Sequence, residues 1–599
     1  MKHKLRWPGA IVTLLSSFFL CIFLLTDRSL PVTSVQEMLS AMEGAQMGAL
    51  CVILLGCLLF HGVFSLRIPG AGRLAALGSA LFTLCEALGY HIYHYDSLLR
   101  PQTNLFSLAL DFACLVGAFL LFYSLLMLIF RFVTTYTFSQ ATTPRGERWF
   151  GDNLRSFLLY FSIPFVICLG LQLFFHPGII TWDSYVMIEE GLGNRPLTDR
   201  NPFLLTLFMK VVIDLGTKLF GSLSGGIALF TLLQTLFVCL TTAFTMTYLA
   251  RRRLHLGLRI GVFCYFVLHP AIACYSVTIW KDIWLSYFVL LYVLFLLEIL
   301  TNPENFFRKK SHFVALALVI LGFLFSKNTG IALFLVTAPF LLWKGRAHLK
   351  PLLCVVLLCL CLLGIVRFAV IPGFGIQSGS LGDPMSVPLQ QIARTCVRAE
   401  DSLTPEQIAV ISEILPYEDL PEYYDPTISD MVKMYFSEEN FSHNPGRYIA
   451  LWVELGKTHP RIYLESFLAN SCGYWYPGVI YWQVTAGSPY PAETTLYGLR
   501  HYFVHLYEML QTVPCISTLL STALPFWACF VLYLICLLKK KKTLGLPLLV
   551  VLITWVLCIF SPVIAEYRYA FPAVLLLPVL TAFTLQDDLY PAESMGIRR

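Results

Sequence analysis

Apolar runs long enough to cross a bilayer recur along the whole chain, from Pro8 to Leu585, and short polar segments separate them. A membrane-spanning helix needs about 20 predominantly apolar residues. Helices are favoured inside lipid because they satisfy every backbone polar group internally. The pattern predicts an all-α polytopic membrane protein with about 14 transmembrane helices.

Residues 312–343 decide that number, because the motif SKNTG (326–330) interrupts an apolar stretch at its middle. A single helix would place Lys327 at mid-membrane depth, where a charge is costly. We predict instead two short helices that form a hairpin. This choice puts residues 372–513 outside the cell and Lys539–Lys542 inside.

The charge distribution supports this topology. Hydrophobic residues make up 57% of the chain and charged residues 13%, well below the roughly one quarter of an average soluble domain. Most Lys and Arg residues fall in the predicted cytoplasmic segments, as the positive-inside rule requires. We expect a multi-pass cell-membrane protein with both termini in the cytoplasm. No region is both basic and aromatic enough to indicate a nucleic-acid partner.

The topology divides the chain into five parts. They are an N-terminal four-span module (1–132), a cytoplasmic linker (133–155), a membrane core (156–371) whose first outer loop is 176–223, an extracytoplasmic domain (372–513), and C-terminal transmembrane helices with a short cytoplasmic tail (514–599). We expect the extracytoplasmic domain to be mixed and mainly helical, with helices near 403–415 and 445–470. Its aromatic segment 470–483 is expected to lie on the membrane or stack on sugar rings.

Most of the 18 cysteines lie in apolar runs, where cysteine behaves as a small hydrophobic residue. Only Cys396, Cys472 and Cys515 fall in or next to the large polar region. Their spacing leaves open whether any two of them form a disulfide.

The first outer loop concentrates polar side chains between an apolar span and the motif RNP (200–202). Asp183 heads a short predicted helix on which Glu190 shares its face, because positions seven apart align. Thr181 or Asp183 could be only an N-cap. The alternative hypothesis is an active-site loop with Asp183 at its centre.

Every short outer loop of the core carries charged or amide side chains beside aromatic or proline residues. One interpretation is that these side chains pair with one another at the rim of the helix bundle. The other is a cavity in which cations hold an anionic headgroup, since Arg binds phosphate through its planar fork and Lys as a point charge. The residues concerned are Asp183, Glu189, Glu190, Arg200, Lys281, Asp282, Lys327, Asn328, Glu566 and Arg568.

The order of motifs resembles the C-type glycosyltransferase (GT-C) superfamily of polyprenyl-phosphate-sugar-dependent membrane enzymes. It is more closely similar to an uncharacterised bacterial multi-pass family of that superfamily. The resemblance covers about 156–585 and rests on HPG-x4-DS (176–184), RNPFLLT (200–206), HP and WKD (269–270, 280–282), SKNTG (326–330), PLQQIAR (388–394), NSCGYWYP (470–477) and EYRYAFP (566–572). The N-terminal four-span module lies outside it.

The resemblance implies that the core is GT-C-like and moves a sugar from a polyprenyl-phosphate donor to a glycan, lipid or protein acceptor at the outer face of the membrane. Asp183 would be the catalytic base or position the acceptor, with Glu189 and Glu190 as further candidate acids. Lys281, Lys327 and Arg568 would bind the donor phosphate, and Asp282, Asn328, Arg200 and Glu566 would support them.

One departure and two alternatives stay open. Asp183 is followed by Ser184 rather than by a second acid, which leaves a divalent metal cofactor in doubt. A flippase or transporter of lipid-linked saccharides is the first alternative, although we find no internal repeat of the kind typical of transporters. A non-catalytic envelope assembly protein is the second.

Overall fold

The computed structural model describes residues 7–26, 32–41, 46–99, 104–139, 144–377, 379–479, 497–561 and 563–587. In these ranges every regular element is a helix, and the only β-type pairings are isolated bridges between loops. The prediction of an all-α architecture is confirmed.

Eight helical segments of the described chain are long and apolar enough to cross a membrane. They are α4 (Ala71–Tyr95), α5 (Leu105–Thr135), α7 (Leu154–Phe174), α10 (Leu223–Arg251), α13 (Lys281–Thr301), the segment Arg346–Gly373 around α17 (Leu349–Ile365), the segment Lys542–Ile559 around α29 (Gly545–Ile559), and α30 (Tyr567–Leu585). The chain is therefore a polytopic membrane protein.

Further apolar helices accompany these eight. The pair α11 (Leu256–Leu268) and α12 (Pro270–Ser276) passes the same test as one segment bent by 57°. Shorter apolar helices are α1 (Trp7–Leu25), α3 (Gln46–Phe64), α15 (Lys310–Leu324), α16 (Asn328–Lys344) and α28 (Ala523–Leu538). Most of the apolar runs of the sequence fall on these helices or on the bent pair, but the run at 514–538 is divided between α27 (Pro514–Leu519) and α28.

The predicted break within residues 312–343 is confirmed, because α15 ends at Leu324 and α16 begins at Asn328. The two helices pack against each other. Gly330 permits this close packing: a Cβ at that position would lie 2.3 Å from the carbonyl oxygen of Phe323. The break brings Lys327 to the end of a helix instead of the middle of one.

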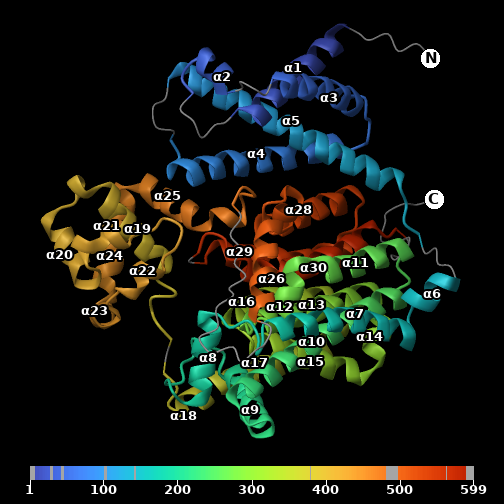
Figure 1. Ribbon diagram of the computed structural model, residues 1–599, viewed down its shortest axis with the longest axis vertical. Coiled ribbons are helices and arrows are strands. Elements are labelled where there is room, and N and C mark those ends of the chain that lie inside the picture. The colour runs from blue at the N-terminus through green and yellow to red at the C-terminus, as the bar shows by residue number, and fades with distance from the viewer. Residues whose placement is uncertain are drawn as a thin grey trace.

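Helices α13 and α30 form the centre of the bundle. They are the most enclosed of the long apolar helices, with 67% and 72% of their central residues buried. They pack on each other, and α10, α11, α15, α28 and α29 surround them (Figure 1). The first residues of both helices therefore lie inside the protein rather than against lipid.

Residues 386–471 form a compact unit, which we call the polar helical domain. Its helices are α19 (Ser386–Arg398), α20 (Pro405–Ile414), α21 (Leu420–Tyr423), α22 (Asp430–Met434), α23 (Glu438–His443), α24 (Pro445–Thr458) and α25 (Pro460–Ser471). Leu389, Ile411 and Leu455 belong to its separate hydrophobic core. The helices expected near 403–415 and 445–470 are confirmed as α20, α24 and α25.

The aromatic segment that follows is buried, and the expectation that it lies on a membrane or a sugar is wrong for the described residues 470–479. Tyr474, Trp475 and Tyr476 are at most 7% exposed. Their backbone carbonyls accept hydrogen bonds from the indoles of α28 and α29: Trp527 donates to Trp475 at 3.0 Å and Trp555 to Tyr474 at 2.8 Å. The segment joins the polar helical domain to the bundle. Residues 480–483 lie outside the described residues.

Cys396 and Cys472 are free thiols buried in two different hydrophobic clusters, so they do not form a disulfide with each other. The side chain of Cys515 lies outside the described residues.

The N-terminal module comprises α1, α2 (Val35–Ala41), α3, α4 and α5. It also contacts the polar helical domain. The buried Arg394 donates to Oδ1 of Asp96 at 2.7 Å, and Arg398 donates to Oδ2 of the same carboxylate. Asp96 directly follows α4. The network gives the module a structural role that its sequence did not indicate.

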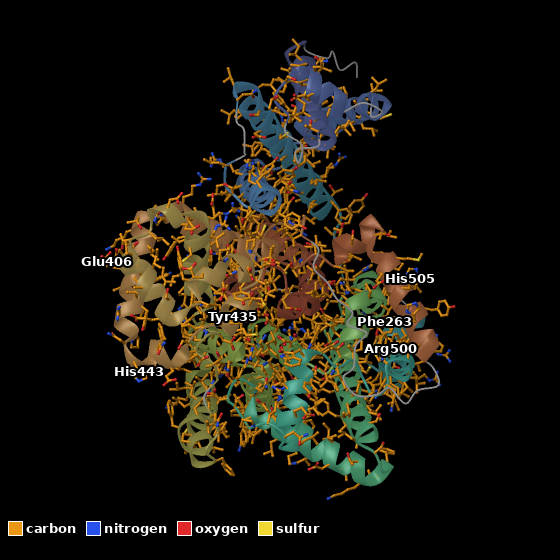
Figure 2. The ribbon with its side chains drawn as sticks, turned by 60° about the vertical axis from the view of Figure 1, so that its left-hand side comes forward. Phe263, Glu406, Tyr435, His443, Arg500 and His505 are labelled. Atoms are coloured by element: carbon orange, nitrogen blue, oxygen red, sulfur yellow. The ribbon has the colours of Figure 1, made fainter. Side chains whose placement is uncertain are left out.

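The remaining helices lie around the bundle. They are α6 (Pro144–Phe150), α8 (Trp182–Leu192), α9 (Phe203–Phe220), α14 (Pro303–Arg308), α18 (Ile371–Gly373), α26 (Tyr497–Gln511) and α27 (Pro514–Leu519). Figure 1 shows α8, α18 and the polar helical domain at one end of the bundle, with α6 and α14 at the other. Helix α26, which carries Arg500 and His505, lies against α7 on the side away from Glu406 of the polar helical domain (Figure 2).

Candidate active site

Helix α8 is fixed to the bundle at its first turn. The Thr181 backbone N–H donates to Oγ of Ser184 at 3.2 Å, and the two hydroxyls are 3.0 Å apart, so Thr181 is the N-cap. Ser184 Oγ donates to the carbonyl of Ile279, and the Trp280 indole donates to Oγ1 of Thr181 at 2.5 Å. The N-cap hypothesis thus applies to Thr181 and not to Asp183.

The side chain of Asp183 forms an ion pair with a residue at the bundle centre. Arg568, in the first turn of α30, donates from Nη1 to Oδ2 of Asp183 at 2.6 Å. The Asp183 side chain is 31% exposed and the Arg568 side chain 13%. The pair links α8 to the first turn of α30 across 385 residues of sequence.

Burial by itself raises the pKa of Asp183, but the charges of Arg568 and Lys281 act in the opposite direction and prevail. Together with the hydrogen bond from Arg568, they lower the pKa from 3.8 to about 2. Asp183 is therefore a carboxylate over the whole physiological pH range.

Lys281 lies next to this pair, at the first residue of α13. Its Nζ donates to Oδ1 of Asn201 at 2.9 Å, and among the described residues it forms no ion pair with a carboxylate. Asn201 in turn donates to Glu190 at 3.0 Å, and Thr198 donates to the other Glu190 oxygen at 2.8 Å. Among the described residues, Lys281 is thus held by a neutral amide rather than by a carboxylate.

A second buried ion pair lies beside the first. Lys327, at the break between α15 and α16, donates to Oδ1 of Asp282, whose side chain is only 2% exposed. The Lys327 amine also lies 3.9 Å from the centre of the Tyr569 ring. Oδ2 of Asp282 is buried and has no hydrogen-bond partner in the part of the chain that the structure describes.

Arg568 contacts other groups besides Asp183, and part of its hydrogen-bonding capacity is unused among the described residues. Its guanidinium lies over the rings of Trp280 and Tyr569, at 5.0 and 5.2 Å. Its Nε is 3.5 Å from Oε1 of Glu566 and makes no hydrogen bond to a described residue. Burial raises the pKa of Glu566, although Arg568 acts to lower it. Buried polar atoms without partners are uncommon and are often found where a ligand or water binds.

The other predicted residues form the border of this cluster rather than its interior. Glu189 accepts from Asn194 at 2.9 Å within the turn after α8, and Arg200 pairs with Asp383 at 3.2 Å. Asn328 accepts from Arg367 at 2.7 Å. Glu190 accepts the hydrogen bond from Asn201 that is described above. The structure therefore brings together Asp183, Lys281, Asp282, Lys327, Glu566 and Arg568, and it places the other four around them.

Arg367 is a site residue that sequence reasoning missed. It lies in a π-helical turn, Val366–Val370, at the end of an apolar span, and its guanidinium bridges Asn328 and Asp199, the latter at 2.8 Å. Such π turns are frequent at functional sites. The one signal in the sequence is a lone arginine near the outer end of a predicted span.

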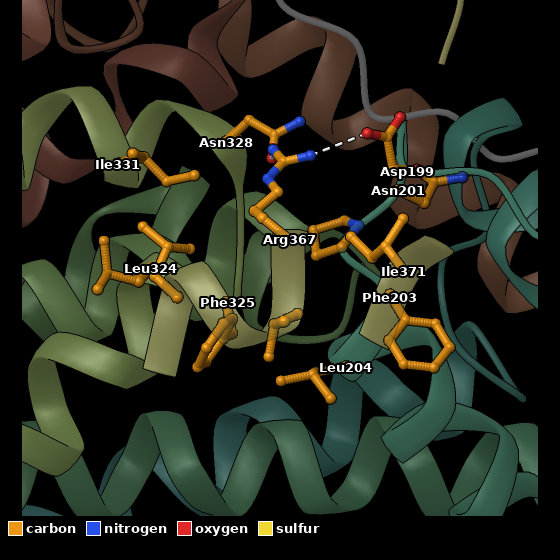
Figure 3. A pocket seen from close by; sticks show the side chains of 13 residues that line it. Asp199, Asn201, Phe203, Leu204, Leu324, Phe325, Asn328, Ile331, Arg367 and Ile371 are labelled. Atoms are coloured by element: carbon orange, nitrogen blue, oxygen red, sulfur yellow. Dashed lines mark hydrogen bonds and ion pairs between the residues drawn. The ribbon is translucent and has the colours of Figure 1, made fainter. Parts of the chain in front are cut away.

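Arg367 also lines a pocket with two kinds of wall (Figure 3). Asp199, Asn201, Asn328 and Arg367 gather on one side, and apolar side chains such as Leu204, Phe325 and Ile371 form the other. The polar side adjoins the charged cluster, because Asn201 bonds Lys281 and Asn328 follows Lys327. The pocket thus lies between the charged cluster and an apolar surface.

The cluster can stabilise negative charge with three cations while an ionised carboxylate accepts a proton. Among the described residues, no group of three His, Cys, Asp or Glu side chains is placed to hold a metal ion. The chemistry that the visible side chains support is acid–base and electrostatic.

Comparison with known proteins places the chain in a family. No curated protein and no solved structure matches it. A family model matches residues 193–593, a range that includes Lys281, Lys327, Arg367 and Arg568 and begins after Asp183. The protein therefore belongs to the family of unknown function DUF6020.

Proposed function

We propose that this protein is an inverting membrane glycosyltransferase that moves a sugar from a polyprenyl-phosphate donor to a cell-envelope acceptor at the outer face of the membrane. The observation that carries the proposal is the placement of an ionised carboxylate, Asp183, beside a lysine without a carboxylate partner, Lys281. Both lie next to a pocket with one polar and one apolar wall. The many apolar helices and the resemblance of the motifs to those of GT-C enzymes support the same assignment.

The proposed reaction is a single displacement. The acceptor hydroxyl attacks the anomeric carbon and transfers its proton to Asp183, while the bond from that carbon to the phosphate oxygen breaks. The phosphate leaves with the bonding electrons, and Lys281 and Arg568 stabilise its charge. Arg568 would exchange Asp183 for the phosphate when the donor binds, which frees the carboxylate to act as a base.

The rival function, transport of a lipid-linked saccharide, has one observation in its favour. The pair α11–α12 is a broken helix, and transporters bind their substrates at such breaks. Here the break carries His269, which contacts the hydroxyl of Tyr567 at 3.3 Å, and the charged cluster lies at other helix ends. The cluster therefore favours the enzyme.

Lys281 provides the test of donor binding. Membranes with equal amounts of each variant are given a panel of polyprenyl-phosphate sugars, and the released polyprenyl phosphate is measured. Lys281→Gln should raise the KM for the donor tenfold or more, because a cation that contacts the phosphate is lost. Lys218→Gln, at an exposed position in the last turn of α9, is the matched control. No release by the parent with any donor, or an unchanged KM in Lys281→Gln, would refute the assignment.

A further inference from the structure

A second pocket lies between α8 and α9 and is separate from the charged cluster. Its volume is about 320 Å³, within the range of roughly 300–1,000 Å³ that is usual for small-molecule sites. Leu197, Phe203 and Leu207 form apolar parts of its wall, and Gly191 contributes backbone without a side chain. The pocket can therefore bury an apolar group of substantial size.

The polar groups of this pocket favour a negatively charged ligand. Lys210 and Arg195 both line it. In the described part of the chain, the one ion pair of Lys210 is an exposed pair with Asp214 at 3.3 Å, and exposed pairs of this kind contribute little stability. The guanidinium of Arg195 lies 5.6 Å from the ring centres of Trp182 and Tyr185.

Two further groups define the interior. Thr206 is 1% exposed and lines the pocket, and its hydroxyl has no hydrogen-bond partner among the described residues. Glu190 also lines the pocket, but Thr198 and Asn201 already bond both of its carboxylate oxygens. The hydroxyl thus has unused hydrogen-bonding capacity at the wall of the pocket, whereas both carboxylate oxygens are already bonded.

The surface of α9 connects the pocket to an apolar environment. Leu207, Val211 and Leu215 are exposed along one face of this helix, at 44%, 59% and 52%. An apolar chain that leaves the pocket would pass along this face. Lys210 and Arg195 supply the positive charge that complements an anionic head.

We propose that the pocket between α8 and α9 binds an anionic amphiphile, a molecule with a phosphate head on an apolar chain, at a site distinct from the Lys281–Arg568 cluster. Lys210 and Arg195 contact the phosphate, and Leu197, Phe203 and Leu207 surround the first part of the chain. The site does not depend on sugar transfer.

Photo-crosslinking in nanodiscs tests this directly. The probes are phosphatidylglycerol and phosphatidylcholine that carry the same diazirine acyl chain. Phosphatidylglycerol should label residues 191–210 at least fivefold more than phosphatidylcholine. Leu207→Trp fills the pocket and should lower that labelling at least fivefold, whereas Val211→Trp, one turn further along the exposed face, should not.

A second pair of variants tests how positive charge contributes to binding of the anionic lipid. Lys210→Gln should remove most of the preference for phosphatidylglycerol, and Lys218→Gln, in the last turn of the same helix, should keep it. Unlabelled polyprenyl phosphate or phosphatidylglycerol is then added as a competitor, and the stronger competitor identifies the chain type of the occupant. Equal labelling by the two probes, or parental labelling in both Leu207→Trp and Lys210→Gln, would overturn the proposal.

Discussion

Asp183 and Arg568 constrain each other's chemistry, because their charged groups are 2.6 Å apart at the edge of a largely buried cluster. The pKa of Asp183 lies below its usual value, so ionised Asp183 stabilises the folded state above pH 3.8. This stabilisation is lost as the pH falls toward 2. The acid limb of activity that Asp183 sets in the parent should therefore lie well below pH 5.

Arg568→Gln should move that limb. Without the guanidinium, burial becomes the dominant influence, and the pKa of Asp183 rises. We expect the acid limb of kcat/KM for the donor to shift to higher pH by at least one pH unit, together with a lower maximum. Arg568→Lys keeps a positive charge and should shift it less. A profile in Arg568→Gln that has the same acid limb as the parent would show that Asp183 is not the group whose ionisation matters.

At the scale of elements, the site is assembled where helices begin or break. Lys281 is the first residue of α13, Arg568 lies in the first turn of α30, and Lys327 lies between the end of α15 and the start of α16. At each of these positions a charged side chain reaches the bundle centre from a helix end. No charge then has to lie in the middle of an apolar helix. The second ion pair, Asp282 with Lys327, is the part of this assembly with the clearest energetic consequence.

Lys327→Met should destabilise the protein strongly, because it leaves the buried Asp282 carboxylate without its cation. Breaking a buried pair typically costs about 3–5 kcal/mol, whereas loss of an exposed pair costs about 1 kcal/mol or less. Thermal unfolding in detergent should show a large fall in Tm for Lys327→Met and a small one for Lys210→Met. The double variant Asp282→Asn with Lys327→Met should recover part of the loss. Equal Tm values for the two single variants would contradict a buried, paired Asp282.

The sequence predicts these elements better than it predicts their contacts. Hydropathy and the SKNTG interruption locate the helices and the break, because lipid burial leaves a direct pattern in the chain. The hydrogen bond from Lys281 to Asn201 spans 80 residues and the one from Arg367 to Asp199 spans 168. No local pattern encodes such pairings. The burial of Tyr474 was likewise missed, because an aromatic cluster next to a membrane resembles an interfacial anchor until its packing is known.

At the scale of the whole molecule, α8, α18 and the polar helical domain lie at one end of the bundle, and α6 and α14 at the other (Figure 1). Asp183 of α8 connects the charged cluster to the first end through its ion pair with Arg568. The positive-inside rule predicts that the first end faces outward. Asp96 connects the N-terminal module to the polar helical domain through its ion pairs with Arg394 and Arg398. Thr427 connects the polar helical domain to the start of α30, because its carbonyl accepts a hydrogen bond from the backbone N–H of Ile564, two residues before Glu566.

Sidedness can be tested with two introduced cysteines. Glu406→Cys lies in the polar helical domain and Glu304→Cys in α14, and both positions are exposed. An impermeant thiol reagent added to intact cells should label Glu406→Cys and should label Glu304→Cys only after permeabilisation. The parent, with its native thiols, provides the background. Labelling of Glu304→Cys in intact cells would reverse the proposed orientation.

The central claim is that the Asp183 carboxylate accepts the proton of the acceptor hydroxyl. Asp183→Asn is the most direct test, because Thr181 already caps α8 and the amide preserves the size of the side chain. The measurement is transfer of labelled sugar from polyprenyl phosphate in membranes that contain equal amounts of each folded variant, with donor binding measured in parallel. We predict that Asp183→Asn binds the donor and loses transfer by about a hundredfold to ten-thousandfold, as is typical of removing a general base. Transfer at the parental rate would contradict the account.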